Sequence, residues 1–190
     1  MQRIRKRLPN ALATFWGLAE ATVFFIVPDV LLSWLALRSL RGALIACLFA
    51  LLGALVGGTA IWLIAQQDPE SLRRLFALIP AIDSGMIDSV HSQLATDGLV
   101  ALFIGPLIGT PYKIYALEAA VLQLGFLPFL LVSIPARLIR FVLVASLVAA
   151  LNHSLSRRLS VRQRQGLLVA CWVVFYAWYF HVMGAAGPTA

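Results

Sequence analysis

Long apolar stretches alternate with short polar segments along the chain, and several of these stretches have the length of a membrane-crossing helix. About 20 apolar residues in a helix cross a bilayer core of about 30 Å. Apolar stretches of about this length occupy residues 42–66, 126–151 and 166–184. The pattern predicts an all-α integral membrane protein with about three full transmembrane helices.

Two further apolar stretches, residues 11–37 and 99–126, are long enough to cross but are broken in the middle. The interrupting residues are Glu20, Pro28 and Asp29 in the first, and Gly105, Pro106, Gly109, Pro111 and Lys113 in the second. Because proline ends or kinks a helix, we expect Pro28, Pro106 and Pro111 to shape two loops. Such breaks are tolerated at membrane depth only where protein or water covers the backbone. Two kinked but otherwise ordinary helices are the alternative.

An apolar helix follows each broken stretch, so the chain repeats one arrangement. Paired broken segments at corresponding positions of two halves are typical of inverted repeats with a binding site near the bilayer midplane. We therefore predict one polytopic membrane domain over residues 1–190 with two re-entrant helical hairpins. Its parts are a first half at about 11–66, an amphipathic connector at 68–97, a second half at about 98–151 and a last helix at 166–184.

The connector contains two helix starts, at Asp68 and at Asp83, where an acidic side chain can cap the first turn. After Asp83, Ile87, Val90 and Leu94 recur at helical spacing among polar residues. This spacing predicts a helix that lies along the membrane interface.

Glycines mark one face of the predicted helix at 42–66. Gly53, Gly57 and Gly58 leave room for close helix packing of the kind seen between membrane helices. That packing can occur within one chain or between two copies in a homodimer, and the sequence pattern is consistent with both.

The composition excludes several functional classes. Hydrophobic residues make up 61% of the chain and charged residues 12%, against about 45–50% and about 25% in soluble domains. The net charge of +7 comes from basic residues at the ends of apolar stretches, which favours membrane anchoring over nucleic-acid binding. Cys47 and Cys171 lie in apolar segments without metal-binding spacing. Because no hydrolase, nucleotide-binding or zinc motif occurs, we expect neither an enzyme with catalytic residues nor a cofactor or metal site.

The basic residues predict a multi-pass membrane protein with a cytoplasmic N-terminus. Re-entrant and fully crossing versions of the broken stretches give the same count of basic residues on each side, so both stay open. The last helix carries aromatic residues that are typical of a belt at the membrane interface: Trp172, Tyr176, Trp178 and Tyr179.

Six ionisable residues fall within the apolar stretches and balance in sign: Glu20, Asp29, Lys113, Glu118, Arg137 and Arg140. A charge at the bilayer centre costs about 2.5–3.5 kcal/mol, so these groups must pair, hydrate or lie near an interface. One interpretation is a water-filled site in which Lys113, Arg137 and Arg140 bind a phosphate and Glu20 and Asp29 exchange protons.

The alternative is that the same charged residues only stabilise the fold. Arg137 and Arg140 can extend to an interface, with Glu118 paired to them only to hold the fold. His91, in the connector, is expected to be a solvated surface residue.

The order and spacing of several short motifs resemble the DedA, or VTT-domain (SNARE-associated-like), membrane proteins over residues 15–151. The motif residues are Glu20, Phe24, Pro28-Asp29, Gly53, Gly57, Pro106, Pro111-Tyr112-Lys113, Arg137 and Arg140. The resemblance implies two facing re-entrant hairpins, with membrane-embedded acids at Glu20 and Asp29 and bases at Lys113, Arg137 and Arg140. Two features depart from the family pattern: Pro28-Asp29 lacks the usual glycine between its residues, and no arginine occurs at 103–107.

The charged, broken stretches and the resemblance together favour lipid translocation by a flippase or scramblase. The resemblance also implies a place in a bacterial inner (plasma) membrane. The expected partner is a lipid with an anionic headgroup, either an anionic phospholipid or a polyprenyl phosphate such as undecaprenyl phosphate, with proton coupling through Glu20 and Asp29. A non-transporting membrane scaffold or assembly factor is the alternative. A lipid-modifying enzyme that uses Glu20 or Asp29 as a base is a third, less favoured possibility.

Overall fold

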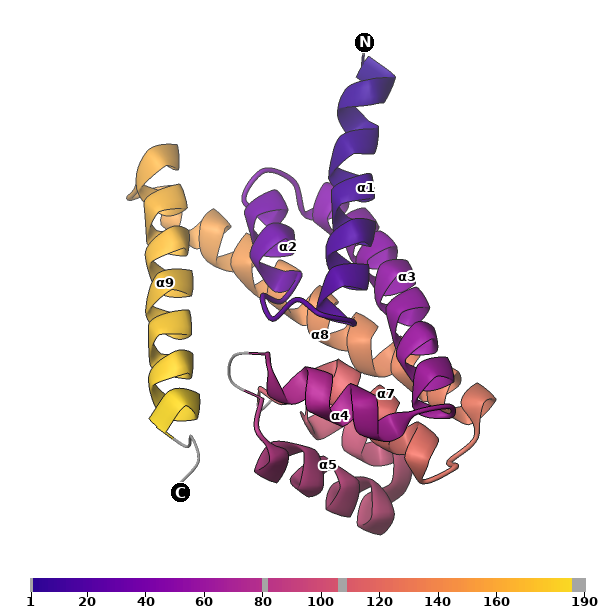
Figure 1. Cartoon of the computed structure of the whole chain (residues 1–190). Helices are drawn as coiled ribbons and strands as arrows, with labels where there is room; N and C mark the ends of the chain where they lie inside the picture. The colour runs from indigo at the N-terminus through magenta and orange to yellow at the C-terminus, as the bar shows by residue number, and fades with distance from the viewer. Residues whose placement is uncertain (1, 80–81, 106–108, 186–190) are drawn as a thin grey trace.

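The computed structural model describes residues 2–79, 82–105 and 109–185, and all regular structure in this part of the chain is helical. Figure 1 shows the order and arrangement of the helices. Their bounds are α1 (Gln2–Glu20), α2 (Asp29–Ala36), α3 (Leu40–Ala65), α4 (Pro69–Ala77), α5 (Ser84–Asp97), η1 (Gly98–Val100), α6 (Ala101–Ile104), α7 (Tyr112–Val121), α8 (Phe126–Leu155) and α9 (Val161–Ala185).

Within the described residues, the helices α3, α8 and α9 are long and apolar enough to cross a membrane. They correspond to the predicted full spans, so the prediction of an all-α chain with about three helices able to cross a membrane is confirmed. Helix α9 begins earlier than predicted because Ser160 and Gln163 cap its first turn reciprocally. The Ser160 N–H donates to Gln163 Oε1 at 2.8 Å, and the Gln163 N–H donates to Ser160 Oγ at 3.4 Å.

The first broken stretch forms a helical hairpin that lies against α3 and α8. Helix α1 runs beside α3 in the same direction, because Thr14 lies near Gly53 and Ala21 near Gly57. The chain then turns, and the Trp16 indole N–H donates to the Ile26 carbonyl at 2.9 Å across the turn. Helix α2 returns to the level at which α3 begins, as Figure 1 shows. The hairpin tip therefore lies about halfway along α3.

Glycines on α3 bring it close to α1. A Cβ atom on Gly53 would lie 1.9 Å from the Thr14 carbonyl oxygen, and one on Gly57 would lie 2.7 Å from the Ala21 Cβ atom. No side chain fits between the two backbones at these points. These two glycines therefore serve packing within one chain, which was one of the alternatives left open by the sequence.

The connector forms α4 and α5 with the predicted caps. Asp68 Oδ1 accepts from the Ser71 N–H at 3.0 Å, and Asp83 Oδ1 accepts from the Met86 N–H at 2.7 Å. The predicted stripe of α5, formed by Ile87, Val90 and Leu94, is buried in the same core cluster as α7. The apolar face of α5 therefore packs on protein.

The second broken stretch also forms two short helical parts. Helix α6 ends at Ile104 and α7 begins at Tyr112, directly after Pro111 in extended conformation. With 4 and 10 residues, neither part can cross a bilayer at 1.5 Å rise per residue. Pro28 likewise directly precedes α2. Pro106, the third predicted loop-shaping residue, lies outside the described residues.

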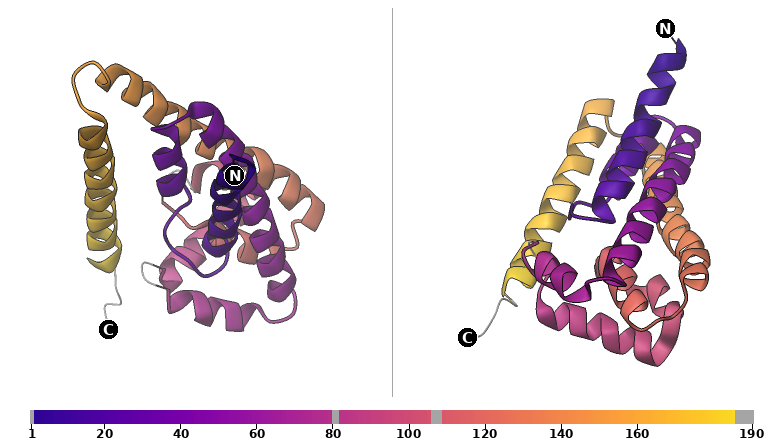
Figure 2. Two further views of the ribbon diagram at one scale, coloured as in Figure 1. Left: turned by 90° about the horizontal axis from the view of Figure 1, so that it is seen from above. Right: turned by 45° about the vertical axis from the view of Figure 1, so that its right-hand side comes forward.

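Helix α9 stands apart from the other helices. Figures 1 and 2 both show it separated from α8 except near the turn that joins them. None of its membrane-crossing part is buried inside the protein. Its contacts with the rest of the chain are made mainly by side chains near α2 and near the two loops.

Candidate functional site

The two loops that break the apolar stretches meet in space. Lys113, in the first turn of α7, donates a hydrogen bond from Nζ to the Phe24 carbonyl oxygen at 2.8 Å. Lys113 is only 1% exposed, so its ammonium group lies inside the protein. Segments that are 89 residues apart along the chain thus form one site.

Two arginines of α8 form ion pairs with the acids of the first loop. Arg137 donates from both terminal nitrogens to the Glu20 carboxylate, with Nη1 3.3 Å from Oε1 and Nη2 in close contact with Oε2. One turn later, Arg140 Nη2 lies 2.8 Å from Asp29 Oδ2. The fork of an arginine suits a carboxylate and equally suits a phosphate.

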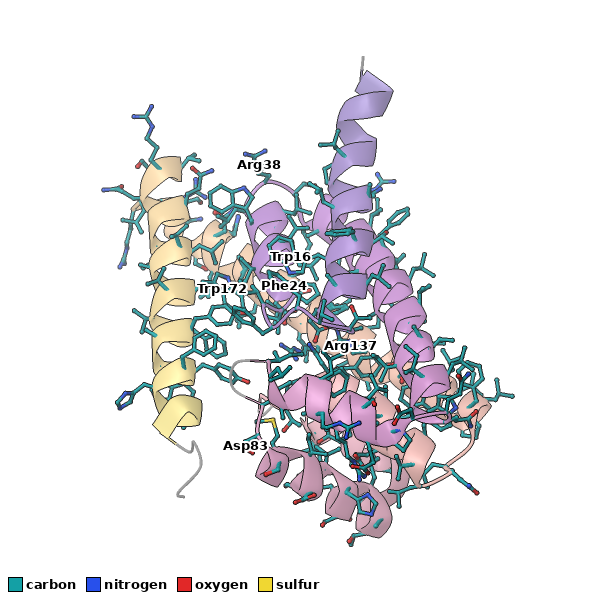
Figure 3. All side chains as sticks on the ribbon, viewed as in Figure 1. Trp16, Phe24, Arg38, Asp83, Arg137 and Trp172 are labelled. Carbon is teal, nitrogen blue, oxygen red and sulfur yellow. The ribbon has the colours of Figure 1, made fainter. Side chains whose placement is uncertain are left out.

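Arg137 is held in place by aromatic rings as well as by its ion pair. Its guanidinium carbon lies 4.7 Å from the centre of the Tyr112 ring and 4.9 Å from that of Phe141. Figure 3 shows Arg137 in the middle of the molecule, where α1 ends. Because it is 1% exposed, the structural interpretation in which it extends to an interface is wrong for Arg137.

Glu118 lies elsewhere, in a second charged cluster. It is fully buried, and its carboxylate accepts from Arg73 Nε at 2.9 Å and Nη2 at 2.8 Å. His91 Nδ1 lies 2.8 Å from the same carboxylate. Hydrogen bonding to Glu118 raises the pKa of Arg73 above its usual value. The suggested pairing of Glu118 with Arg137 or Arg140 is therefore wrong, because α7 turns Glu118 toward α4 and α5.

Sequence reasoning missed Arg73 and misjudged His91. His91 was expected to be solvated, whereas it contacts a buried carboxylate through a side chain that is 40% exposed. The sequence did contain one signal, which is Glu118 itself. A buried acid needs a basic partner, and the connector contains basic residues to which the sequence analysis gave no partner.

The separation of Glu118 changes the charge of the loop site. Two acids, Glu20 and Asp29, remain with three bases, Lys113, Arg137 and Arg140. The formal charge of this group is +1, whereas the sequence predicted balance. In the described part of the chain, no carboxylate lies within ion-pair distance of Lys113. The site therefore contains one more basic than acidic side chain, and Lys113 is the base without an ion-pair partner among the described residues.

A small cavity, called the loop cavity below, lies beside Lys113, and its lining combines charged side chains with apolar ones. Its volume is about 50 Å³, and Glu20, Thr110, Lys113 and Arg140 contribute to its lining. That volume holds on the order of a few water molecules. The site thus has room for water but not for a lipid headgroup without movement of the loops.

Three polar side chains of α9 close the site on one side. The Trp172 indole N–H donates to Ser33 Oγ at 3.0 Å, and Tyr176 Oη accepts from the Val27 N–H at 2.9 Å. The Tyr179 hydroxyl donates to the Gly109 carbonyl at 3.4 Å. These residues were expected in an interfacial belt. They contact α2 and both loops, and Figure 3 shows Trp172 pointing from α9 toward α2.

Comparisons with known proteins give relatives without a stated function. An uncharacterized protein of Haemophilus influenzae is 28% identical over 144 residues, which is 72% of each chain. An uncharacterized protein of Histophilus somni is 35% identical over 77 residues, covering 40% of this chain and 38% of the relative. The chain thus matches well under two thirds of the second relative. No family model matches the sequence, and no solved structure matches it.

Proposed function

We propose that this protein moves an anionic lipid between the leaflets of a bacterial inner membrane, as a flippase or scramblase. The observation that carries this proposal is the buried positive charge of Lys113 where the two loops meet. A charge inside a membrane protein is costly unless it is neutralised. A lipid phosphate is the anion that a membrane supplies in quantity.

The proposed architecture has two hairpins, α1–α2 and α6–α7, that enter the bilayer from opposite sides and return. Helix α2 has 8 residues and a length of about 12 Å, far less than a bilayer core of about 30 Å. The Asn152 side chain, near the end of α8, donates to the Leu37 carbonyl at 3.2 Å, which supports a return of the first hairpin to that end of α8. The predicted inverted repeat and cytoplasmic N-terminus belong to this proposal.

In the proposed cycle, the acids hold the arginines when the site is empty. A phosphate bound by Lys113, Arg137 and Arg140 takes the place of Glu20 and Asp29 as the partner of the guanidinium groups. With both carboxylates ionised, a singly charged phosphate brings the formal charge of the site from +1 to zero. A doubly charged phosphate does the same when one carboxylate takes up a proton. The buried arginines then have an anionic partner at every stage, which avoids the cost of a stranded charge.

A scaffold without transport is supported by one specific observation. Glu20 and Arg137 form a nearly solvent-free pair, and the adjoining cavity of about 50 Å³ is too small for a headgroup. A purely structural ion-pair network would have this closed form. The two functions differ in what single charge removals do: in a scaffold they lower abundance, whereas in a transporter some spare the fold and abolish flux.

The test is leaflet exchange in liposomes that contain the purified protein. Labelled polyprenyl phosphate and a common phospholipid are followed for wild type and for Glu20→Gln, which keeps the size of the side chain but removes its charge. The proposal predicts exchange by wild type and loss of exchange by folded Glu20→Gln. Absence of exchange of either lipid by folded wild type, with a proton gradient imposed, would favour the scaffold.

A further inference from the structure

An apolar groove separates α9 from α8. Its volume is about 610 Å³, more than ten times that of the loop cavity. Leu143, Val144 and Val148 form the α8 wall, and Leu168, Cys171 and Trp178 contribute to the α9 wall. These walls present hydrocarbon to the gap, so the gap suits a hydrocarbon chain better than water.

The groove opens directly onto the charged site. The groove and the loop cavity share five lining residues: Val27, Gly109, Arg140, Phe175 and Tyr179. Asp29 also lines the groove, and its Oδ1 atom is buried without a hydrogen-bond partner among the described residues. A molecule that extends from Lys113 and Arg140 in the loop cavity into the groove would therefore pass from a charged end to an apolar end.

Helix α9 forms the outer wall without packing tightly on the bundle. Its membrane-crossing part has no buried residue, and hydrogen bonds of Trp172, Tyr176 and Tyr179 tie it to α2 and the loops. Such contacts fix the position of α9 while leaving the space beside α8 unfilled by side chains. An empty apolar space of this size would lose the contacts that stabilise a packed interior.

We infer that the groove between α8 and α9 binds the hydrocarbon chain of a membrane lipid whose phosphate headgroup lies at Lys113 and Arg140. This inference rests on the proposed function and adds the path of the chain. The polar headgroup moves through the protein while the chain stays in the groove, which opens laterally to the bilayer. The charge at one end and the apolar walls along the rest match the two parts of an anionic lipid.

A tryptophan placed in the groove tests the inference. Cys171→Trp fills the groove from α9, and Val144→Trp fills it from α8. Val174→Trp is the matched control, because Val174 is on the same helix, is 66% exposed and does not line the groove. The assay is exchange of phosphatidylglycerol in liposomes, measured by periodate oxidation of the glycerol headgroups exposed outside.

The inference predicts that both groove variants exchange lipid about tenfold more slowly than wild type, since overpacking excludes the chain. Val174→Trp should keep the wild-type rate. If both groove variants exchange lipid at the wild-type rate while Glu20→Gln still abolishes exchange, the inference that the groove binds the chain is wrong. The proposed function is then unaffected.

Photocrosslinking tests the groove independently of flux. Phosphatidylglycerol with a diazirine in its chain is mixed into phosphatidylcholine liposomes that contain wild-type protein. Excess unlabelled phosphatidylglycerol should reduce labelling of Cys171 but not of Val174, which contacts bulk lipid. Equal competition at the two positions would overturn the inference, even if wild type shows no exchange.

Discussion

The Glu118 cluster makes an asymmetric prediction for stability. Glu118 is fully buried, whereas the Arg73 side chain is 30% exposed and also bonds Glu70 at 3.0 Å. Removal of Arg73 by Arg73→Met leaves a buried carboxylate with only His91 beside it. Removal of the charge by Glu118→Gln leaves an arginine that can turn toward water. Arg73→Met should therefore lower the free energy of unfolding more than Glu118→Gln does.

The magnitudes follow from burial. A stranded buried charge costs about 3–5 kcal/mol, so Arg73→Met should lower the melting temperature by roughly 6–20 °C in a chain of this length. Glu118→Gln loses charge-assisted hydrogen bonds to a partner that can rehydrate, about 1.5–3 kcal/mol. The double variant should be more stable than Arg73→Met, because neither partner is then left as a buried, unpaired charge.

Thermal unfolding of the purified protein in detergent, followed by circular dichroism, measures these differences. Arg74→Met is the control: Arg74 is exposed and donates to Ser71 Oγ at 3.0 Å, so this substitution should cost less than about 0.5 kcal/mol. Arg73→Met with the stability of Arg74→Met, or a double variant less stable than Arg73→Met, would refute the reasoning.

Two further predictions concern packing and the loop site. Gly53→Ala should sharply reduce folded protein, because its Cβ atom would meet the Thr14 carbonyl at 1.9 Å. Gly166→Ala, with no atom within 4 Å of its added Cβ atom, should leave the yield unchanged, and size-exclusion chromatography compares the two. Arg137→Met should destabilise the protein by about 3–5 kcal/mol, whereas adding Glu20→Leu should restore most of the melting temperature. That double variant should not exchange lipid. Exchange at the wild-type rate would show that transport does not need the Glu20–Arg137 ion pair.

Local signals in the sequence were sufficient for much of the fold. The caps at Asp68 and Asp83 and the stripe of Ile87, Val90 and Leu94 depend on residues within a few positions of one another. The breaks at Pro28 and Pro111 likewise end up directly before α2 and α7, since proline restricts its own backbone wherever it occurs.

Pairing between distant segments could not be predicted in the same way. Six charged residues of balanced sign in the apolar stretches allow many pairings. The hydrophobic periodicity does not show which charged residues of the connector also take part. Glu118 binds Arg73 and His91 because α7 packs on α4 and α5, a contact between residues 45 and 27 positions apart. The positive charge left at Lys113 is a consequence of that packing.

The contacts of α9 could not be predicted for the same reason, because they join residues far apart in the sequence. Trp172 and Tyr176 fit an interfacial belt by composition, but their hydrogen bonds reach Ser33 and Val27, which are 139 and 149 residues away. Amphipathic aromatic residues satisfy a polar partner at an interface or inside a protein equally well. Their composition alone therefore did not reveal that they hydrogen-bond to α2 and to the first loop.

The most direct test of the central claim is the dependence of lipid exchange on the charge of Lys113. Purified wild type, Lys113→Met and the surface control Arg74→Met are reconstituted into liposomes, and exchange of phosphatidylglycerol is measured for protein shown to be folded. The account predicts that wild type and Arg74→Met exchange this anionic lipid and that Lys113→Met does not. Exchange by folded Lys113→Met at the wild-type rate would contradict the assignment of this buried charge to the lipid phosphate.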